Sequence, residues 1–262
     1  MIYIKTPSEI ETMKKAGKIL GKTMGILLAA IKPGVSEIEI DRLAEKTIRE
    51  MGGEPGFKKV EGYHYTICVS TNDVSVHGIP GNYKFKEDDV VGIDCGVYLN
   101  GFHTDMAETI RVKNEKSEAG IKKEDEIDRF LRIGKDALNA GIDQVKPGNR
   151  VGHISKTVQE IVENKGRYSV VRSLVGHGVG RNLHEDPEVP GYLFGSVSST
   201  PLLKTGMVIA VEIIYNMGGS EVVYAGNGDN WTIKTADGSL AGLFERTVLV
   251  TDAGYEIITP LE

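Results

Sequence analysis

The chain has 262 residues, of which 40% are hydrophobic and 26% are charged, a composition typical of a globular fold with a buried core. Its formal net charge of −6, without a long Lys/Arg block, argues against duplex nucleic acid as a primary ligand. The longest apolar run, ILLAAI, is too short to cross a bilayer, and the polar N-terminal stretch has no signal-peptide core. The two cysteines, Cys68 and Cys95, argue against a disulfide framework and favour a reducing cytoplasm.

Two helical segments are predicted at the N-terminal end of the chain. Residues 10–31 carry an apolar helical pattern, and the amphipathic pattern that follows Pro33-Gly34 ends near Gly52. A second pair of helical segments lies within 126–166 and is also divided by a Pro-Gly dipeptide. Lys-Pro-Gly occurs at 32–34 and again 114 residues later. This spacing indicates that the second pair repeats the first.

Strand-like segments follow each helical pair. The segments 85–98 and 203–216 match at an offset of 118, close to the offset of the helices. We therefore expect one α/β (α+β) domain over 1–262, duplicated internally with halves at roughly 1–112 and 113–262. In it, helices would cover a largely antiparallel sheet. A chance match between two common helix–Pro-Gly–helix segments is the alternative.

The segment DCGVYLNGFHTD, at 94–105, predicts a β-hairpin that carries two carboxylates. Asn100-Gly101 favours a two-residue turn, which would place Asp94 opposite Ala107. Asp94 and Asp105 then become diagonal neighbours on one face, roughly 7–8 Å apart. A three-residue loop would place them on opposite faces. Because the adjoining VVGID is too apolar for a solvated hairpin, a bound cation is the economical way to keep both carboxylates there.

Two further carboxylates interrupt apolar strand patterns. Glu212 lies within MVIAVEIIY and matches Asp94 in the internal repeat, and Glu245 lies within LFERTVLV. A Glu in such a strand could instead pair with a cation, and Arg246 is the candidate partner of Glu245. Four carboxylates of this kind favour a site for two divalent ions about 3.5–4 Å apart.

Three histidines lie at the ends of strands or in glycine-rich loops. His177 stands between glycines, His184 precedes an acidic, proline-containing turn, and His77 precedes a Gly-Ile-Pro turn. The chain has no G-x-S-x-G elbow, P-loop or H-E-x-x-H motif, so those chemistries are excluded. What the pattern leaves is an Asp/Asp/His/Glu/Glu cluster with two additional histidines.

The chain resembles the methionine aminopeptidases, which are pita-bread metallopeptidases, in the order of these five cluster residues and in the motifs that flank them. The resemblance extends over almost the whole chain, through CVSTNDVSVHGIPG, DCGVYLNGFHTD, GHGVGRNLHEDPEV and NWTIKTADGSLAGLFERTVLV. The chain lacks the large insertion of the type II enzymes, so it is similar to a short, bacterial-style type I enzyme. The resemblance implies a pita-bread fold and a monomer.

The resemblance also implies a role for each cluster residue. Asp94 would be the terminal ligand of one ion, and Asp105 and Glu245 would bridge both ions. His177 and Glu212 would complete the shell of the other ion. Two divalent ions, whether Co, Mn, Fe or Zn, would activate the water that attacks the scissile carbonyl.

Catalytic and substrate-binding roles follow from the same resemblance. Glu212 would be the general base, His184 would stabilise the carbonyl oxyanion, and His77 would contact the backbone nitrogen beyond the scissile bond. The walls of the methionine pocket would be Cys68, Trp231 and a tyrosine, either Tyr63 or Tyr65. The implied substrate is the N-terminal methionine of nascent polypeptides with a small second residue. Contact with the ribosome near the exit tunnel is left open by the sequence.

The chain departs from the family pattern at two single residues, and its segment EGYHYTICV is shorter than the usual pocket segment, which leaves the choice of tyrosine open. Ile213 follows the strand glutamate where the family usually has proline, and Arg246 follows the last glutamate where it usually has histidine. Two other functions are the alternatives. A proline-specific peptidase of the same fold usually carries a preceding domain, which we do not expect before Ile10. A non-catalytic pita-bread binder would typically have lost metal ligands, whereas all five are present here.

Overall fold

The computed structural model describes residues 1–113 and 124–262. The helical segments predicted from the sequence are confirmed, although the last passes without a break into the π-helical turn η2, Glu160–Gly166. Within the described residues, no helix combines the length and the apolar character needed to span a membrane. The α-helices are α1 (Pro7–Ala30), α2 (Glu37–Glu50), α3 (Glu126–Ile142) and α4 (Val151–Gln159).

The strands of the described residues form one large and one small antiparallel sheet. The large sheet has the order β1-β4-β5-β12-β9-β7-β8, with β2 paired to β4, β6 to β9 and β13 to β12, and the small sheet has the order β10-β11-β3. The strands are β1 (Glu54–Pro55), β2 (Ile67–Thr71), β3 (Val74–Val76), β4 (Val90–Leu99), β5 (Phe102–Arg111), β6 (Ser169–Val170), β7 (Gly176–Gly178), β8 (Glu185–Val189), β9 (Val208–Asn216), β10 (Val222–Gly226), β11 (Asp229–Thr235), β12 (Ala241–Thr251) and β13 (Gly254–Ile257). Short 3₁₀ turns are η1 (Phe57–Lys59) and η3 (Val197–Ser199).

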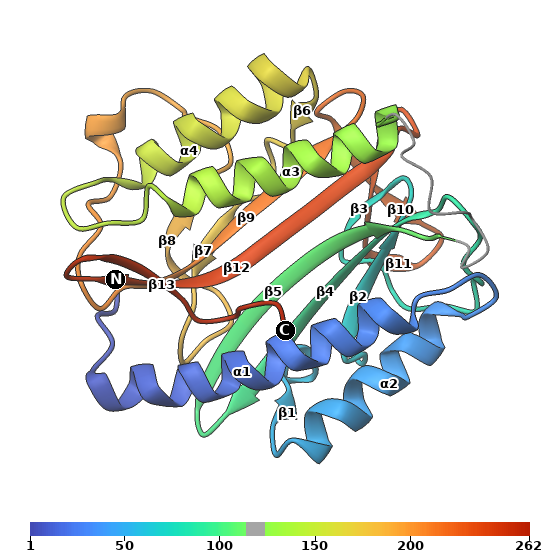
Figure 1. Cartoon of the computed structure of the whole chain (residues 1–262), viewed down its shortest axis with the longest axis horizontal. Coiled ribbons are helices and arrows are strands. Elements are labelled where there is room, and N and C mark those ends of the chain that lie inside the picture. The colour runs from blue at the N-terminus through green and yellow to red at the C-terminus, as the bar shows by residue number, and fades with distance from the viewer. Residues whose placement is uncertain (114–123) are drawn as a thin grey trace.

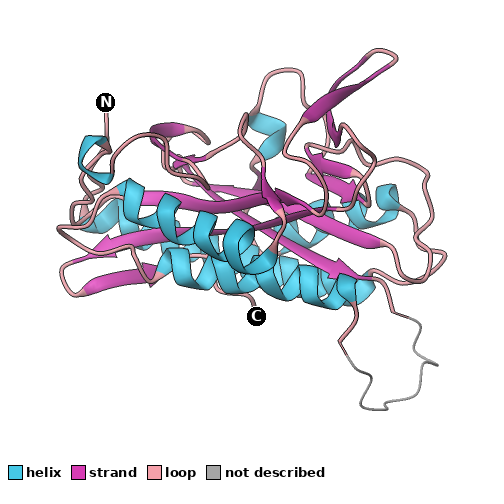
Figure 2. Cartoon of the chain, turned by 90° about the horizontal axis from the view of Figure 1, so that it is seen from above, coloured by secondary structure: helices cyan, strands magenta, loops and turns pink. Residues whose placement is uncertain are grey.

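The long helices lie on one side of the large sheet. In Figure 1, α1 and α2 run along one half of the sheet, and α3 and α4 run along the other half. α1 packs on β4 and β5, and α3 packs on β9 and β12. Figure 2 shows the hairpin of β10 and β11 projecting on the side away from these helices. The four long helices therefore leave the opposite face of the sheet uncovered, and a functional site can form there.

Alternation along the central strands separates the core from the polar face. On β4, Ile93 and Cys95 belong to the core with residues of α1 and α2, and on β9, Val211 and Ile213 belong to the core with residues of α3 and α4. Because successive side chains of a strand point to opposite faces, the carboxylates between these residues point away from the helices. Ile213, one of the two departures from the family pattern, thus serves as a fully buried core residue.

The predicted hairpin is confirmed in its turn and its register. Asn100 and Gly101 both have positive φ values, 47° and 93°, as a two-residue turn of type I′ requires. Leu99 pairs with Phe102, and the ladder continues from there, residue for residue, to the far end of β5. The carboxylates of the hairpin therefore share one face.

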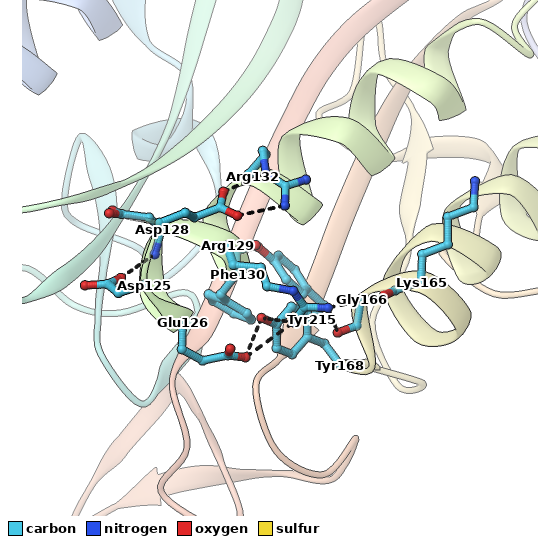
Figure 3. A network of polar contacts seen from close by, with 11 residues as sticks. Asp125, Glu126, Asp128, Arg129, Phe130, Arg132, Lys165, Gly166, Tyr168 and Tyr215 are labelled. Atoms are coloured by element: carbon cyan, nitrogen blue, oxygen red, sulfur yellow. Dashed lines mark hydrogen bonds and ion pairs between the residues drawn. The ribbon is translucent and has the colours of Figure 1, made fainter. Parts of the chain in front are cut away.

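A polar network fixes α3 against η2 and β9. The guanidinium of Arg129 donates to the Tyr168 hydroxyl (2.8 Å) and to the main-chain oxygens of Gly166 (2.9 Å) and Lys165 (3.2 Å), so it satisfies carbonyls at the end of η2 (Figure 3). The Tyr215 hydroxyl donates to the main-chain oxygen of Phe130 at 2.6 Å. Since Tyr215 lies on β9, this contact holds the strand that carries Glu212 against α3.

Candidate metal centre

A row of directly paired residues crosses the large sheet. In order, the row contains Cys68, Asp94, Ala107, Glu245 and Glu212, from β2, β4, β5, β12 and β9. Residues that are paired in this way point to the same face of a sheet. Asp105 precedes Ala107 by two residues and points to that face as well. Four carboxylates from four neighbouring strands therefore converge.

His177 joins this group from β7, the strand beside β9. Ligand atoms of Asp105, His177 and Glu245 all lie within 4.8 Å of one another, as binding to a single metal ion requires. Burial and the nearby His184 lower the pKa of His177 to about 4, so its imidazole is neutral. Its Nδ1 lies 2.8 Å from the carbonyl oxygen of Gly178, which fixes Nδ1 as the donor and leaves the Nε2 lone pair for an ion.

Three carboxylates of the cluster, Asp94, Asp105 and Glu245, are buried, and Glu212 is partly exposed in the cavity. Asp105 is only 4% exposed and Glu245 only 1%. Burial raises the pKa of Asp105 to about 7, and burial with the charge of Asp105 raises that of Glu212 to about 8. The same two causes raise the pKa values of Asp94 and Glu245 well above their ordinary range. The protein alone therefore does not stabilise the full negative charge of this site.

The donor set fits a divalent cation. Oδ1 of Asp94 and Oε1 of Glu245 are buried and have no hydrogen-bond partner within the part of the chain that the structure describes. Buried polar atoms are normally satisfied, so these oxygens point to a missing positive ligand. Carboxylate oxygens with one neutral imidazole suit Mn, Fe, Co or Zn.

The metal-free protein is expected to lose stability as the pH rises from about 4 to 8. Asp105 and Glu212 have ordinary pKa values of 3.8 and 4.5, and both values are raised in the folded state, to about 7 and about 8. Because the folded state then holds more protons than the unfolded chain, its stability is greatest below pH 4 for these groups and declines up to pH 8. Melting temperatures in EDTA at pH 5 and pH 8 measure this slope.

Divalent metal should reverse the loss at pH 8, since an ion that binds only the folded state stabilises it. The double variant Asp105→Asn/Glu212→Gln is the matched control, and its melting temperature in EDTA should depend less on pH. Equal slopes in the two proteins would contradict the titration described here.

Arg246 does not pair with the carboxylate of Glu245, so that alternative is wrong. Its guanidinium extends to the helix-covered face, where it donates to Oε2 of Glu108 at 2.7 Å and to the main-chain oxygens of Ala107 (3.0 Å) and Glu245 (2.7 Å). Glu108 is also paired with Lys135 at 2.8 Å. Arg246 thus ties β12 to β5 from behind the cluster and leaves the Glu245 carboxylate in it.

The cluster forms the floor of a cavity of about 290 Å³. His77, which follows β3, and His184, which precedes β8, both line it, and the rings of His184 and His177 are 4.3 Å apart. One apolar wall of the cavity is formed by residues that include Phe57, Val60, Tyr63, Cys68, Leu183 and Trp231. A ligand in this cavity would touch the carboxylates at one end and aromatic rings at the other.

The structure distinguishes the two candidate tyrosines of the wall. Tyr63 lines the cavity, packs edge to face on Trp231 with 5.1 Å between ring centroids, and donates its hydroxyl to the carbonyl of Ile67 at 2.8 Å. Among the described residues that line the cavity, Tyr65 does not appear, and it packs behind Tyr63 at 5.9 Å.

Sequence reasoning missed several residues of the cavity wall, among them Phe57, Val60 and Leu183. These three lie outside the strands of the large sheet, so no periodic pattern marks them. Phe57 packs on Gly96 of β4, where a Cβ atom would lie 2.8 Å from the ring. A glycine inside an apolar strand signals such a close approach, although it does not identify the partner.

Comparison with known proteins places the chain among metallopeptidases. The model of metallopeptidase family M24 matches residues 11–252. The chain is 44% identical to a methionine aminopeptidase of Clostridium perfringens and 42% identical to methionine aminopeptidase 1 of Bacillus subtilis, and each alignment covers 99% of both chains.

Solved structures show the same likeness. The crystal structure of methionine aminopeptidase from Thermotoga maritima has a TM-score of 0.91 and 39% identity and covers 99% of this chain and 100% of that one. Prolidase from Pyrococcus furiosus has a TM-score of 0.76 and 25% identity, and only 66% of its length is covered. These findings confirm the predicted pita-bread fold and the resemblance to methionine aminopeptidases, and the chain belongs to metallopeptidase family M24.

Proposed function

We propose that the protein is a metal-dependent aminopeptidase that removes the N-terminal methionine from peptides and nascent proteins. The observation that carries this proposal is the convergence of four carboxylates and a neutral imidazole on the floor of a cavity with an aromatic, thiol-containing wall. Relatives that align over nearly their whole length are methionine aminopeptidases. The names of these relatives support a protein that selects methionine, and not proline, in its substrates.

The five side chains would hold two divalent ions. The central position of Asp105 and Glu245, on neighbouring strands β5 and β12, supports a bridging role for both. Asp94 on one flank, and His177 with Glu212 on the other, would complete the two shells. Such ions, when bound, lower the pKa of coordinated water and polarise a carbonyl group.

Three residues of the chain would carry the proton transfer and the substrate contacts. Glu212, which lines the cavity beside the other carboxylates, would accept the proton of the attacking water once bound ions keep it ionised. His184, at the edge of the cavity, would donate to the carbonyl oxygen as negative charge develops there. His77, whose pKa burial lowers to about 4, would offer a neutral ring to the backbone nitrogen beyond the scissile bond.

The wall of the cavity supports selectivity for methionine. Cys68 is 4% exposed and Tyr63 5% exposed, and Trp231 closes the same wall. A flexible thioether packs well on aromatic rings, with a favourable contact between sulfur and ring. The finite volume of the cavity supports a preference for a small second residue.

Release of free methionine from Met-Ala-Ser and Met-Leu-Ser is the test of this proposal. With Mn²⁺ or Co²⁺ we expect cleavage of the alanine peptide at a rate at least about tenfold above the leucine peptide, since each extra methylene that a pocket must reject changes rates by roughly 10–200-fold. EDTA should abolish the activity. Cleavage of Ala-Pro without cleavage of either methionine peptide would overturn the proposal in favour of a proline-specific peptidase.

We also infer that the chain is one internally duplicated domain that acts as a cytoplasmic monomer. The order α1, α2, β4 in the first half matches the order α3, α4, β9 in the second half, and this match supports duplication. Asp94 and Glu212 then occupy equivalent strands. The pairing of β5 with β12 joins the halves in one sheet. Two free, buried cysteines are in keeping with a reducing compartment.

A further inference from the structure

Two buried carboxylates on α2 lie outside the metal cluster. Glu37 is 8% exposed and Asp41 is 6% exposed, and they are one helical turn apart on the same face. Burial raises the pKa of both carboxyl groups. A buried carboxylate is costly, so two on one short helix call for an explanation. In Figure 1, α2 lies beside β2, the strand that carries Cys68.

Capping of the helix does not explain them. Ser36 is the N-cap residue of α2, and its main-chain N–H donates to Oε2 of Glu39 at 2.8 Å. The Ser36 hydroxyl donates to the same oxygen at 2.6 Å. Because Ser36 and Glu39 already form the capping box, the helix has no need of Glu37 and Asp41 at its N-terminus.

Asp41 holds the chain where it enters β2. Its Oδ1 accepts hydrogen bonds from the main-chain N–H groups of Thr66 (2.7 Å) and Ile67 (3.2 Å). The carbonyl of Ile67 in turn accepts the hydroxyl of Tyr63 at 2.8 Å. Cys68 is the next residue along the chain. Asp41 thereby fixes Ile67, the residue whose carbonyl accepts the Tyr63 hydroxyl and which directly precedes Cys68 in the cavity wall.

Glu37 holds the loop that carries His77. Its Oε2 accepts the main-chain N–H of Gly81 at 3.0 Å, and its Oε1 accepts the hydroxyl of Thr71 at 2.7 Å. The main-chain N–H of Ile38 donates to the carbonyl of Gly81 at 2.9 Å, so the loop is tied to the helix in both directions. His77 itself has a φ of 56°, a left-handed conformation that a non-glycine residue keeps only when its surroundings impose it.

We propose that Asp41 and Glu37 are positioning residues, of which Asp41 sets the shape of the methionine pocket and Glu37 sets the place of His77. This inference rests on the proposed function. Because the pocket contributes to binding of substrate and transition state alike, a displaced pocket wall raises KM. A displaced His77 weakens a contact made as the reaction proceeds, and this lowers kcat. The two residues therefore have separable kinetic effects.

Variants that change length but keep charge test the proposal against variants that change charge but keep length. Asp41→Glu and Glu37→Asp move the acceptor by one methylene, whereas Asp41→Asn and Glu37→Gln leave an oxygen in place. We expect Asp41→Glu to raise KM for Met-Ala-Ser roughly 10–100-fold with little change in kcat. Glu37→Asp should lower kcat by a similar factor with little change in KM. The amide variants should stay within a few-fold of the wild-type protein.

The single tryptophan of the chain gives a readout that needs neither metal nor substrate. Trp231 packs on Tyr63, so Asp41→Glu should shift its fluorescence emission more than Glu37→Asp does. If a length variant does not fold, Asp41→Ala removes both hydrogen bonds of Asp41 and carries the expectation for Asp41→Glu. Thr71→Val removes one of the two hydrogen bonds of Glu37 and carries the expectation for Glu37→Asp. Melting temperatures show that the variants compared are folded.

The outcomes separate the two proposals. A folded wild-type protein that releases no methionine with any metal would overturn the proposed function and this inference with it. An active wild-type protein whose Asp41 and Glu37 length variants change kcat and KM alike, or not at all, would overturn the positioning roles alone. Larger effects from the amide variants than from the length variants would show that charge matters instead of position.

Discussion

Replacing Asp105 by asparagine is expected to lower kcat for methionine release by more than about 10³-fold. The change removes a negatively charged oxygen from the centre of the cluster, where ligand atoms of Asp105, His177 and Glu245 lie within 4.8 Å of one another. Loss of an outer partner of a metal ligand typically costs roughly 10–100-fold, and loss of a shared ligand should cost more. Glu245→Gln is expected to behave in the same way. Steady-state kinetics with saturating Mn²⁺ and metal content after dialysis measure both effects.

Glu108→Gln is the matched control for these variants. Glu108 is a buried carboxylate on the same strand as Asp105, but it faces the helices, where it is paired with Arg246 at 2.7 Å and Lys135 at 2.8 Å. Its replacement should lower the melting temperature, because it removes the negative charge that pairs with the largely buried guanidinium of Arg246, while kcat changes by only a few-fold. Normal kcat and normal metal content in Asp105→Asn would show that Asp105 is not a shared ligand.

Replacing His184 by alanine is expected to lower kcat by roughly 10²–10³-fold, the usual cost of losing one donor to a developing oxyanion. Metal content should remain that of the wild-type protein, because the ligand atoms of the cluster come from other residues. His184 lies at the edge of the cavity with its ring 4.3 Å from that of His177, close enough to reach a carbonyl bound above the cluster.

His177→Ala separates the two neighbouring imidazoles. It should reduce metal affinity as well as kcat, since His177 offers its Nε2 atom to the cluster. Metal titration by calorimetry and kinetics at saturating metal distinguish the two losses. An unchanged kcat in His184→Ala would assign oxyanion stabilisation to another group, and a lost metal in that variant would make His184 a ligand.

The hairpin and the sheet carboxylates could be predicted because they depend on local rules. Asn100-Gly101 determines the turn, the turn determines the register, and the period of two then places Asp94 and Asp105 on one face. The apolar runs around Glu212 and Glu245 indicated that these two carboxylates lie within strands. Their meeting across β5, β12 and β9 depends on strand order, which local patterns do not contain and which only the family resemblance implied.

The loops and the supporting residues could not be predicted in the same way. Phe57 and Leu183 reach the cavity from segments without periodicity, so their contribution depends on how distant strands place them. Glu37 and Asp41 look like ordinary polar positions of an amphipathic helix, and only the structure shows their hydrogen bonds to two loops. Arg246 follows Glu245 in the chain, yet the alternation of the strand sends it to the other face.

Anomalous diffraction from crystals of the protein loaded with Mn²⁺ is the most direct test of the metal centre. We predict two peaks about 3.5–4 Å apart on the floor of the cavity, with Asp105 and Glu245 between them, and none there in the Asp105→Asn variant. Loaded crystals with no peak at this cluster, or with peaks bound only to other residues, would contradict the account.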